Sequence, residues 1–289
     1  MAETAPLPVP AERRARRRPR AGSLLGGATL TVVILATALT SFVWTPFAPD
    51  DTGAGIRLGA PSAEHWAGTD KLGRDLFTQL MVGARLAVVV AAGSVAIAAA
   101  LGISLGLLAA VSRRWLDESL SYLFDVMIAL PAVLIAMLIV TVQGASTGSA
   151  ILASGLSFTA IVARLTRVSA ARVLTTDYVR AGRASGTGTL GLLRRHVLPN
   201  ISPILIVQLT LMASSAILVE ASLSYLGLGT APPTASWGRM LLEAQTSVET
   251  APWGALFPGF AILLTVMGLN FLGDGLREVM DPQRGAGDD

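Results

Sequence analysis

Six apolar runs, each long enough to cross a lipid bilayer, constrain the fold of this 289-residue chain more than any other feature. The hydrocarbon core of a bilayer is about 30 Å thick, which takes about 20 residues of α-helix. The runs are continuous and do not alternate between apolar and polar residues, so they predict helices and not the strands of a membrane barrel. They lie near residues 24–43, 84–111, 123–142, 149–168, 203–226 and 253–272. We therefore predict an all-α, polytopic membrane protein with six transmembrane helices.

The composition agrees with this fold class. Hydrophobic residues make up 52% of the chain and charged residues 14%, with a mean hydropathy of +0.61. An ordinary soluble domain carries about a quarter charged residues. The run at 149–168 is the least apolar because serines and a threonine dilute it and Arg164 lies near its end. A count of five spans therefore stays open.

Glycine and proline predict how these helices pack and bend. Gly102 and Gly106 have the small-residue spacing found at membrane helix interfaces, and Gly93 lies on the same run. Pro131 predicts a kink in the run at 123–142, because proline lacks an amide hydrogen and clashes with the preceding turn.

The distribution of basic residues predicts the orientation. Membrane proteins carry an excess of Lys and Arg in their cytoplasmic segments. With the N-terminus inside, 17 of the 22 basic residues are cytoplasmic, and the largest groups are six arginines before Ser23 and seven at 164–195. Removing the fourth span would put the termini on opposite sides and break this asymmetry. Both termini are therefore expected in the cytoplasm.

These spans divide the chain into four parts. Residues 1–22 are expected to form a disordered basic cytoplasmic tail near anionic lipid, although the run that follows also resembles a cleavable signal peptide. Residues 23–83 are expected to hold the first transmembrane helix and an external loop with an interfacial helix, capped by Thr69 or Asp70. Residues 84–276 form a five-helix core with a cytoplasmic loop at 168–202, and residues 277–289 a cytoplasmic C-terminal tail.

Several kinds of chemistry are excluded by residues that the chain lacks. It has no cysteine, and its histidines, His65 and His196, are assigned to opposite sides of the membrane, so no metal site is expected. No nucleophile and base form a coherent catalytic pair, so no catalytic residue is assigned. Lys71 is the only lysine and follows no phosphate-binding loop, so any nucleotide must bind to another chain. Nucleic-acid binding is disfavoured because no aromatic residue is interleaved with the N-terminal arginines.

The segment at 177–200 is a long, basic connection between two spans. Gly186-Thr187-Gly188 predicts a tight turn, because glycine disfavours helix interiors and accepts positive φ. An apolar pattern resumes after this turn, and Pro199 and Pro203 are expected to end it before the fifth span. The prediction is a short helix, a turn and a short helix, and the alternative is an ordinary solvated loop.

This segment resembles the cytoplasmic coupling motif of ABC-importer permeases, written E-A-A-x3-G-x9-I-x-L-P. The spacing is intact, but Arg180 stands in place of the Glu, Gly182 in place of the second Ala and His196 in place of the Ile. The resemblance implies that the segment docks on a separate ATPase. The residues that it assigns to this coupling are Arg180, Ala181, Gly182, Arg183, Ala184, Gly186, His196, Leu198 and Pro199.

Other stretches resemble one branch of that family, the oligopeptide, dipeptide and nickel type permeases. In this branch an arginine in place of the Glu and a histidine before V-L-P are usual. The branch's G-T-D-x-x-G-R-D signature falls on Gly68, Thr69, Asp70, Gly73, Arg74 and Asp75. Stretches at 217–229, 232–241 and 273–282 resemble its remaining signatures. The chain length and the G-T-D-x-x-G-R-D stretch are more similar to the second, C-type subunit of the permease pair.

The resemblance implies a heteromeric importer in a bacterial cytoplasmic (inner) membrane. Its partners would be a second permease, two cytoplasmic ATPase domains that bind ATP and Mg²⁺, and an extracytoplasmic solute-binding protein. The chain itself would need no cofactor and perform no catalysis. Small peptides are the implied cargo, with nickel chelates or another small solute as the alternative.

Two carboxylates within the apolar runs are further candidates, because charges inside a membrane are functional by default. Glu220 is expected near the outer end of its span, either snorkelling, paired structurally or in contact with cargo. Asp125 is expected to pair with an arginine of the loop at 168–202. A secondary transporter would need both as ion sites, and an intramembrane enzyme is the third class considered.

Overall fold

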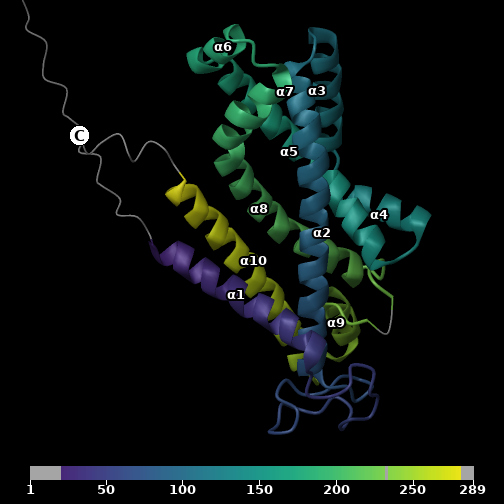
Figure 1. The fold of residues 1–289 in the computed structure, drawn as a ribbon. Coiled ribbons are helices and arrows are strands. Elements are labelled where there is room, and N and C mark those ends of the chain that lie inside the picture. The colour runs from purple at the N-terminus through teal and green to yellow at the C-terminus, as the bar shows by residue number, and fades with distance from the viewer. Residues whose placement is uncertain (1–20, 232–233, 281–289) are drawn as a thin grey trace, which may run out of the picture.

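The computed structural model describes residues 21–231 and 234–280, and these residues form a bundle of α-helices (Figure 1). The two tails expected at 1–22 and 277–289 lie largely outside the described residues, as do positions 232–233 and 281–282 of two signatures. Within the described ranges no strand occurs, and Thr69 and Asp75 form an isolated bridge. The helices are α1 (Ala21–Val43), α2 (Leu76–Val111), α3 (Arg114–Ala129), α4 (Ala132–Gln143), α5 (Thr147–Leu174), α6 (Asp177–Ala184), α7 (Thr189–Leu192), the π-helical η1 (Leu193–Val197), α8 (Leu198–Tyr225), α9 (Trp237–Ala244), the 3₁₀ turn η2 (Gln245–Ser247) and α10 (Trp253–Val279).

The described residues contain five helices long and apolar enough to span a membrane, and six spans if α3 and α4 count as one. These two helices meet at Pro131 with a bend of 89°. The kink expected at Pro131 is therefore confirmed, and it breaks the third span. The fourth run, which the sequence analysis treated as the weakest, is instead one continuous helix of 28 residues.

Helix α5 tolerates its polar residues because it lies inside the bundle. The hydroxyl groups of Ser154, Ser157 and Thr159 are buried and donate to carbonyl oxygens one turn earlier, at 2.9, 2.8 and 2.8 Å. Such bonds satisfy the hydroxyl within its own helix. Low hydropathy in this run therefore reflects a helix surrounded by protein.

Helices α2 and α5 pack along a seam of small residues, as the glycine spacing predicted. A Cβ atom at Gly102 would lie 2.7 Å from the Cβ of Val162, and one at Gly106 would lie 2.6 Å from the Cβ of Thr166. Gly93 faces Ile151 in the same way. Because only hydrogen fits at these positions, the two backbones approach closely.

Helices α1 and α10 form a second close pair, side by side in Figure 1. Cβ atoms at Gly268 and Gly275 would lie 2.8 Å from the Cβ of Leu30 and 2.7 Å from the Cα of Leu24. At the other end of α1, Arg85 of α2 donates to Ser41 and lies 4.1 Å from the ring centroid of Phe42. The start of α1 and the end of α10 lie together at the left of Figure 1, below α6 and α7 and above the loop that follows α1.

The separate interfacial helix expected within 23–83 is not formed. Asp75 caps α2, because its side chain accepts a hydrogen bond from the amide of Thr78 at 2.7 Å. Residues 76–83 are therefore the first turns of a 36-residue helix, and neither Thr69 nor Asp70 is the cap. The apolar spacing that suggested an interfacial helix belongs to the start of the second span.

Candidate functional site

The segment at 177–200 folds as the predicted short helix, turn and short helix, and not as an ordinary loop. Gly186 has φ +84°, in the left-handed region that favours glycine. Its amide donates to Arg183 O and the amide of Thr187 donates to Gly182 O, both at 3.1 Å. This pair of bonds is a Schellman motif, which closes the last turn of α6. We call residues 177–192 the α6–α7 hairpin.

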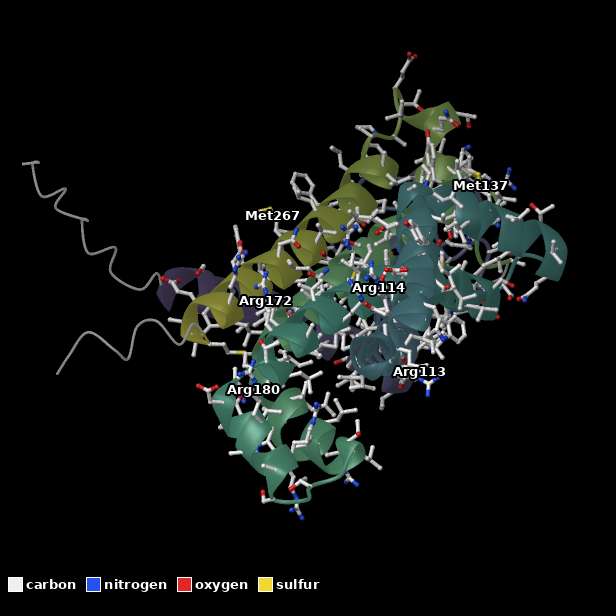
Figure 2. The ribbon with its side chains drawn as sticks, turned by 90° about the horizontal axis from the view of Figure 1, so that it is seen from above. Arg113, Arg114, Met137, Arg172, Arg180 and Met267 are labelled. Atoms are coloured by element: carbon white, nitrogen blue, oxygen red, sulfur yellow. The ribbon has the colours of Figure 1, made fainter. Side chains whose placement is uncertain are left out.

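The hairpin presents one exposed side and buries the other. Val179 and Leu192 are each 1% exposed, and they fix the inner side against the bundle. The exposed predicted coupling residues are Arg180, Ala181, Arg183, Ala184, Gly186 and Pro199, whereas Gly182, His196 and Leu198 are partly buried. Figure 2 looks down on this end of the molecule, with the hairpin to one side of the bundle and Arg180 on it. The hairpin is thus an anchored, basic projection.

Leu190 was missed by the sequence analysis. It belongs to the hairpin and is 70% exposed, next to the turn. Leu190 and Leu192 both belong to the apolar pattern after the turn, but only Leu192 is buried.

Pro199 and Pro203 do not end the helix before the fifth span, contrary to expectation. Helix α7 continues through η1 into α8, so that residues 189–225 form one long helix. Pro199 lies in the first turn of α8, where a missing amide hydrogen costs least. Pro203 leaves the carbonyl of Pro199 without its usual donor, and the hydroxyl of Ser202 donates to that oxygen at 2.9 Å. The hairpin is therefore continuous with a membrane span.

Asp125 forms an ion pair, but its partner lies outside the loop at 168–202. The carboxylate is 3.0 Å from Nη1 of Arg164, which is in α5. One turn along α5, Arg167 donates to both oxygens of Asp117, with Nη2 at 2.6 Å. Two arginines of α5 thus hold α3 against the bundle, and they mark a structural role for Asp125.

Glu220 is 2% exposed and does not snorkel. The hydroxyl of Ser224, one turn later in α8, donates to its Oε1 at 2.6 Å. Nearby, Gly238 of α9 packs directly on Ala221 of α8. These contacts fit the paired structural role, in which Glu220 stabilises the end of α8 where α9 docks.

The G-T-D-x-x-G-R-D signature at 68–75 builds a compact loop. Gly68 and Gly73 have φ values of +80° and +76°. Asp70 accepts from the amides of Leu72 and Arg74 at 2.8 and 2.9 Å, so it closes the turn between the two glycines. Thr69 accepts from the amide of Gly59 at 2.8 Å.

Charged contacts then tie this loop to distant elements. Arg74 donates to Asp70 at 2.6 Å and to Glu243 of α9 at 2.9 Å. Asp75 lies 3.0 Å from Nδ1 of His65, which stacks on Phe47. A cavity of about 220 Å³ lies between the loop and α9. The signature therefore clasps the external loop to α9 and to the start of α2.

Replacing Arg74 with alanine is expected to release the external loop. The substitution leaves Asp70 without its cationic partner and removes one of the two arginines, Arg74 and Arg239, that bind Glu243. A charged hydrogen bond contributes about 1.5–3 kcal/mol. Limited proteolysis of the purified protein should cut residues 44–75 at least about tenfold faster. Arg57→Ala changes an exposed arginine of the same loop and should leave the rate unchanged. Equal rates for the two variants would contradict the clasp.

Comparison with known proteins adds an independent finding. Residues 102–285 match the family described as binding-protein-dependent transport system inner membrane component. The chain is 40% identical over 254 residues to the dipeptide transport system permease protein DppC of Alkalihalophilus pseudofirmus, covering 88% of this chain and 82% of that protein. It is 41% identical over 265 residues to the di/tripeptide transport system permease protein DppC of Pseudomonas aeruginosa, covering 90% and 88%. A putative peptide permease protein of Brucella suis is 37% identical over 284 residues, covering 98% and 93%.

Proposed function

Because the chain belongs to the family of binding-protein-dependent transport system inner membrane components, and is thus a permease subunit of an ABC importer, we propose that it imports small peptides. The translocation path would lie between this chain and a second, different permease. The names of three relatives refer to dipeptides, di- and tripeptides, and peptides, and these names support peptide cargo. A nickel chelate or another small solute is the alternative cargo.

The observation that carries the coupling role is the α6–α7 hairpin. It projects from the bundle, exposes Arg180 and Arg183, and continues without a break into the α8 span. Two cytoplasmic ATPase domains would bind ATP and Mg²⁺, and the hairpin would dock on one of them. Movement of the ATPases would then reach α8 directly, as rocking of packed helices does in other transporters.

The same arrangement supports an orientation with both termini in the cytoplasm. The start of α1, the end of α10 and the hairpin lie toward one side, and the clasped loop at 44–75 lies at the opposite end (Figure 1). The membrane would be the bacterial cytoplasmic membrane. The loop end would face an extracytoplasmic solute-binding protein.

Purification in mild detergent tests the proposal. The chain, expressed with the second permease and the ATPase subunits of its system, should co-purify with both. The complex in proteoliposomes should take up labelled dipeptide only under two conditions. ATP must be present on the side of the membrane that holds the ATPase domains, and the binding protein on the opposite side. Uptake by the chain alone, without ATP, would instead support a secondary transporter.

Glu220→Gln tests the secondary-transporter class at a single residue. Glutamine keeps the side-chain volume and can accept the hydrogen bond from Ser224, so ATP-driven uptake should stay within about twofold of the parent. Glu220→Ala removes the acceptor and should lower the yield of folded protein. Initial uptake per folded permease is the measurement, and abolished uptake in a well-folded Glu220→Gln variant would support an ion site.

A further inference from the structure

We infer that Tyr178, His196 and Asn200 are positioning residues that lock α6 to the start of α8, so that force on α6 is delivered directly to α8 and not only to α5. This inference rests on the proposed coupling function and names the contacts between α6 and α8 through which the coupling would act. The three residues come from the two halves of the segment at 177–200, one from α6 and two from the helix that follows the turn.

The first observation is a hydrogen bond that spans the hairpin. Nδ2 of Asn200 donates to the phenolic oxygen of Tyr178 at 2.9 Å and to the carbonyl of His196 at 3.0 Å. One amide hydrogen of Asn200 thus bonds to α6, and the other bonds to η1, which belongs to the same long helix as Asn200. An asparagine amide has two such donors, so this side chain is fully used as a donor.

The second observation is the packing beside that bond. The rings of Tyr178 and His196 lie 6.0 Å apart between centroids. A Cβ atom at Gly182 would meet Leu192 at 3.2 Å and His196 at 3.7 Å. Two of the three departures from the general motif, Gly182 and His196, therefore face each other, and the small residue on α6 leaves room for the larger one on η1.

The third observation is the direction of these contacts. The contacts of Tyr178 and Gly182 run from α6 to the continuous helix at 189–225. Residues 175–176 join α6 to α5 along the chain, and α6 also contacts α5. The π-helical turn η1 contains His196 and ends three residues before Asn200. Figure 1 has α6 above the upper end of α8. The latch, defined as Tyr178, His196 and Asn200, thus gives α6 a direct connection to α8 in addition to its connection to α5.

The test uses the complete transporter in proteoliposomes with three variants of the latch. Tyr178→Phe removes only the phenolic oxygen, and Asn200→Leu keeps the side-chain size but removes its polar atoms, whereas an aspartate could accept a new hydrogen bond from the Tyr178 hydroxyl. Each should lower the number of peptides imported per ATP hydrolysed about three- to tenfold, the range expected for one lost hydrogen bond. Because both remove the same bond, the double variant should be no worse than either single variant. Tyr225→Phe, the same change at the opposite end of α8, should leave the ratio unchanged.

A spectroscopic readout separates positioning from general damage. The chain has no cysteine, so spin labels can be placed uniquely with Ala184→Cys in α6 and Ile204→Cys in α8. The distance distribution should be narrow in the otherwise unchanged chain and broaden in Tyr178→Phe and Asn200→Leu. Unchanged ratios and distances in both variants, or additive losses in the double variant, would overturn the latch while ATP-driven uptake by the parent complex upholds the proposed function. A parent complex without ATP-dependent uptake would overturn both.

Discussion

Replacing Ala181 with glutamate is expected to reduce peptide uptake at least about tenfold while ATP hydrolysis continues. Ala181 lies on the exposed side of α6, between Arg180 and Arg183. In the assembled importer a glutamate there would place added bulk and an unpaired negative charge in the contact with the ATPase. A tenfold effect corresponds to about 1.4 kcal/mol, less than the 2–5 kcal/mol typical of an unpaired charge at an interface.

The folded chain should tolerate this substitution. Glutamate is a good helix former and the position is solvent-exposed, so the yield and thermal stability of the complex should not change. Ala181→Ser changes the same position by one oxygen and should retain uptake. Gly186→Glu is a poorer test, because φ +84° at this position strains any side chain and would disturb the hairpin itself. Peptide uptake and ATP hydrolysis, measured in the same vesicles, show whether Ala181 lies in the ATPase contact. Normal uptake by Ala181→Glu would place that contact elsewhere.

Local chemistry made the hairpin predictable from sequence. A glycine that must adopt positive φ, followed by an apolar pattern, specifies a helix end and a new helix without distant contacts. The small-residue spacing at Gly102 and Gly106 likewise predicted the seam that the structure confirms. The spans followed from hydropathy, because lipid forces unpaired backbone into helices.

Tertiary contacts explain what the sequence did not reveal. The polarity of α5 suggested a weak span, but its hydroxyl groups bond within a helix that other helices surround. The break expected at Pro203 fails because Ser202 supplies the missing donor. The clasp at Arg74 depends on Glu243, 169 positions away, so no local pattern could have indicated it.

The largest loss of stability is expected when the seam between α2 and α5 is filled. In Gly102→Leu the new side chain would begin 2.7 Å from the Cβ of Val162, deep between two spans that share the bundle core. Overpacking costs about 1–3 kcal/mol, and four added carbons at a helix crossing favour the upper end. At about 2–4 °C per kcal/mol, the midpoint of thermal unfolding in detergent should fall by about 6–12 °C.

Gly259→Leu is the matched control for this substitution. Gly259 lies in the α10 span, and a Cβ atom there would meet nothing within 4 Å. Leucine is also a better helix former than glycine, so this variant should unfold at or slightly above the temperature of the parent. Both variants replace glycine with leucine, so the difference between their unfolding temperatures measures the effect of crowding. If the Gly102→Leu and Gly259→Leu proteins unfold at the same temperature, the close approach of α2 and α5 does not hold the bundle together.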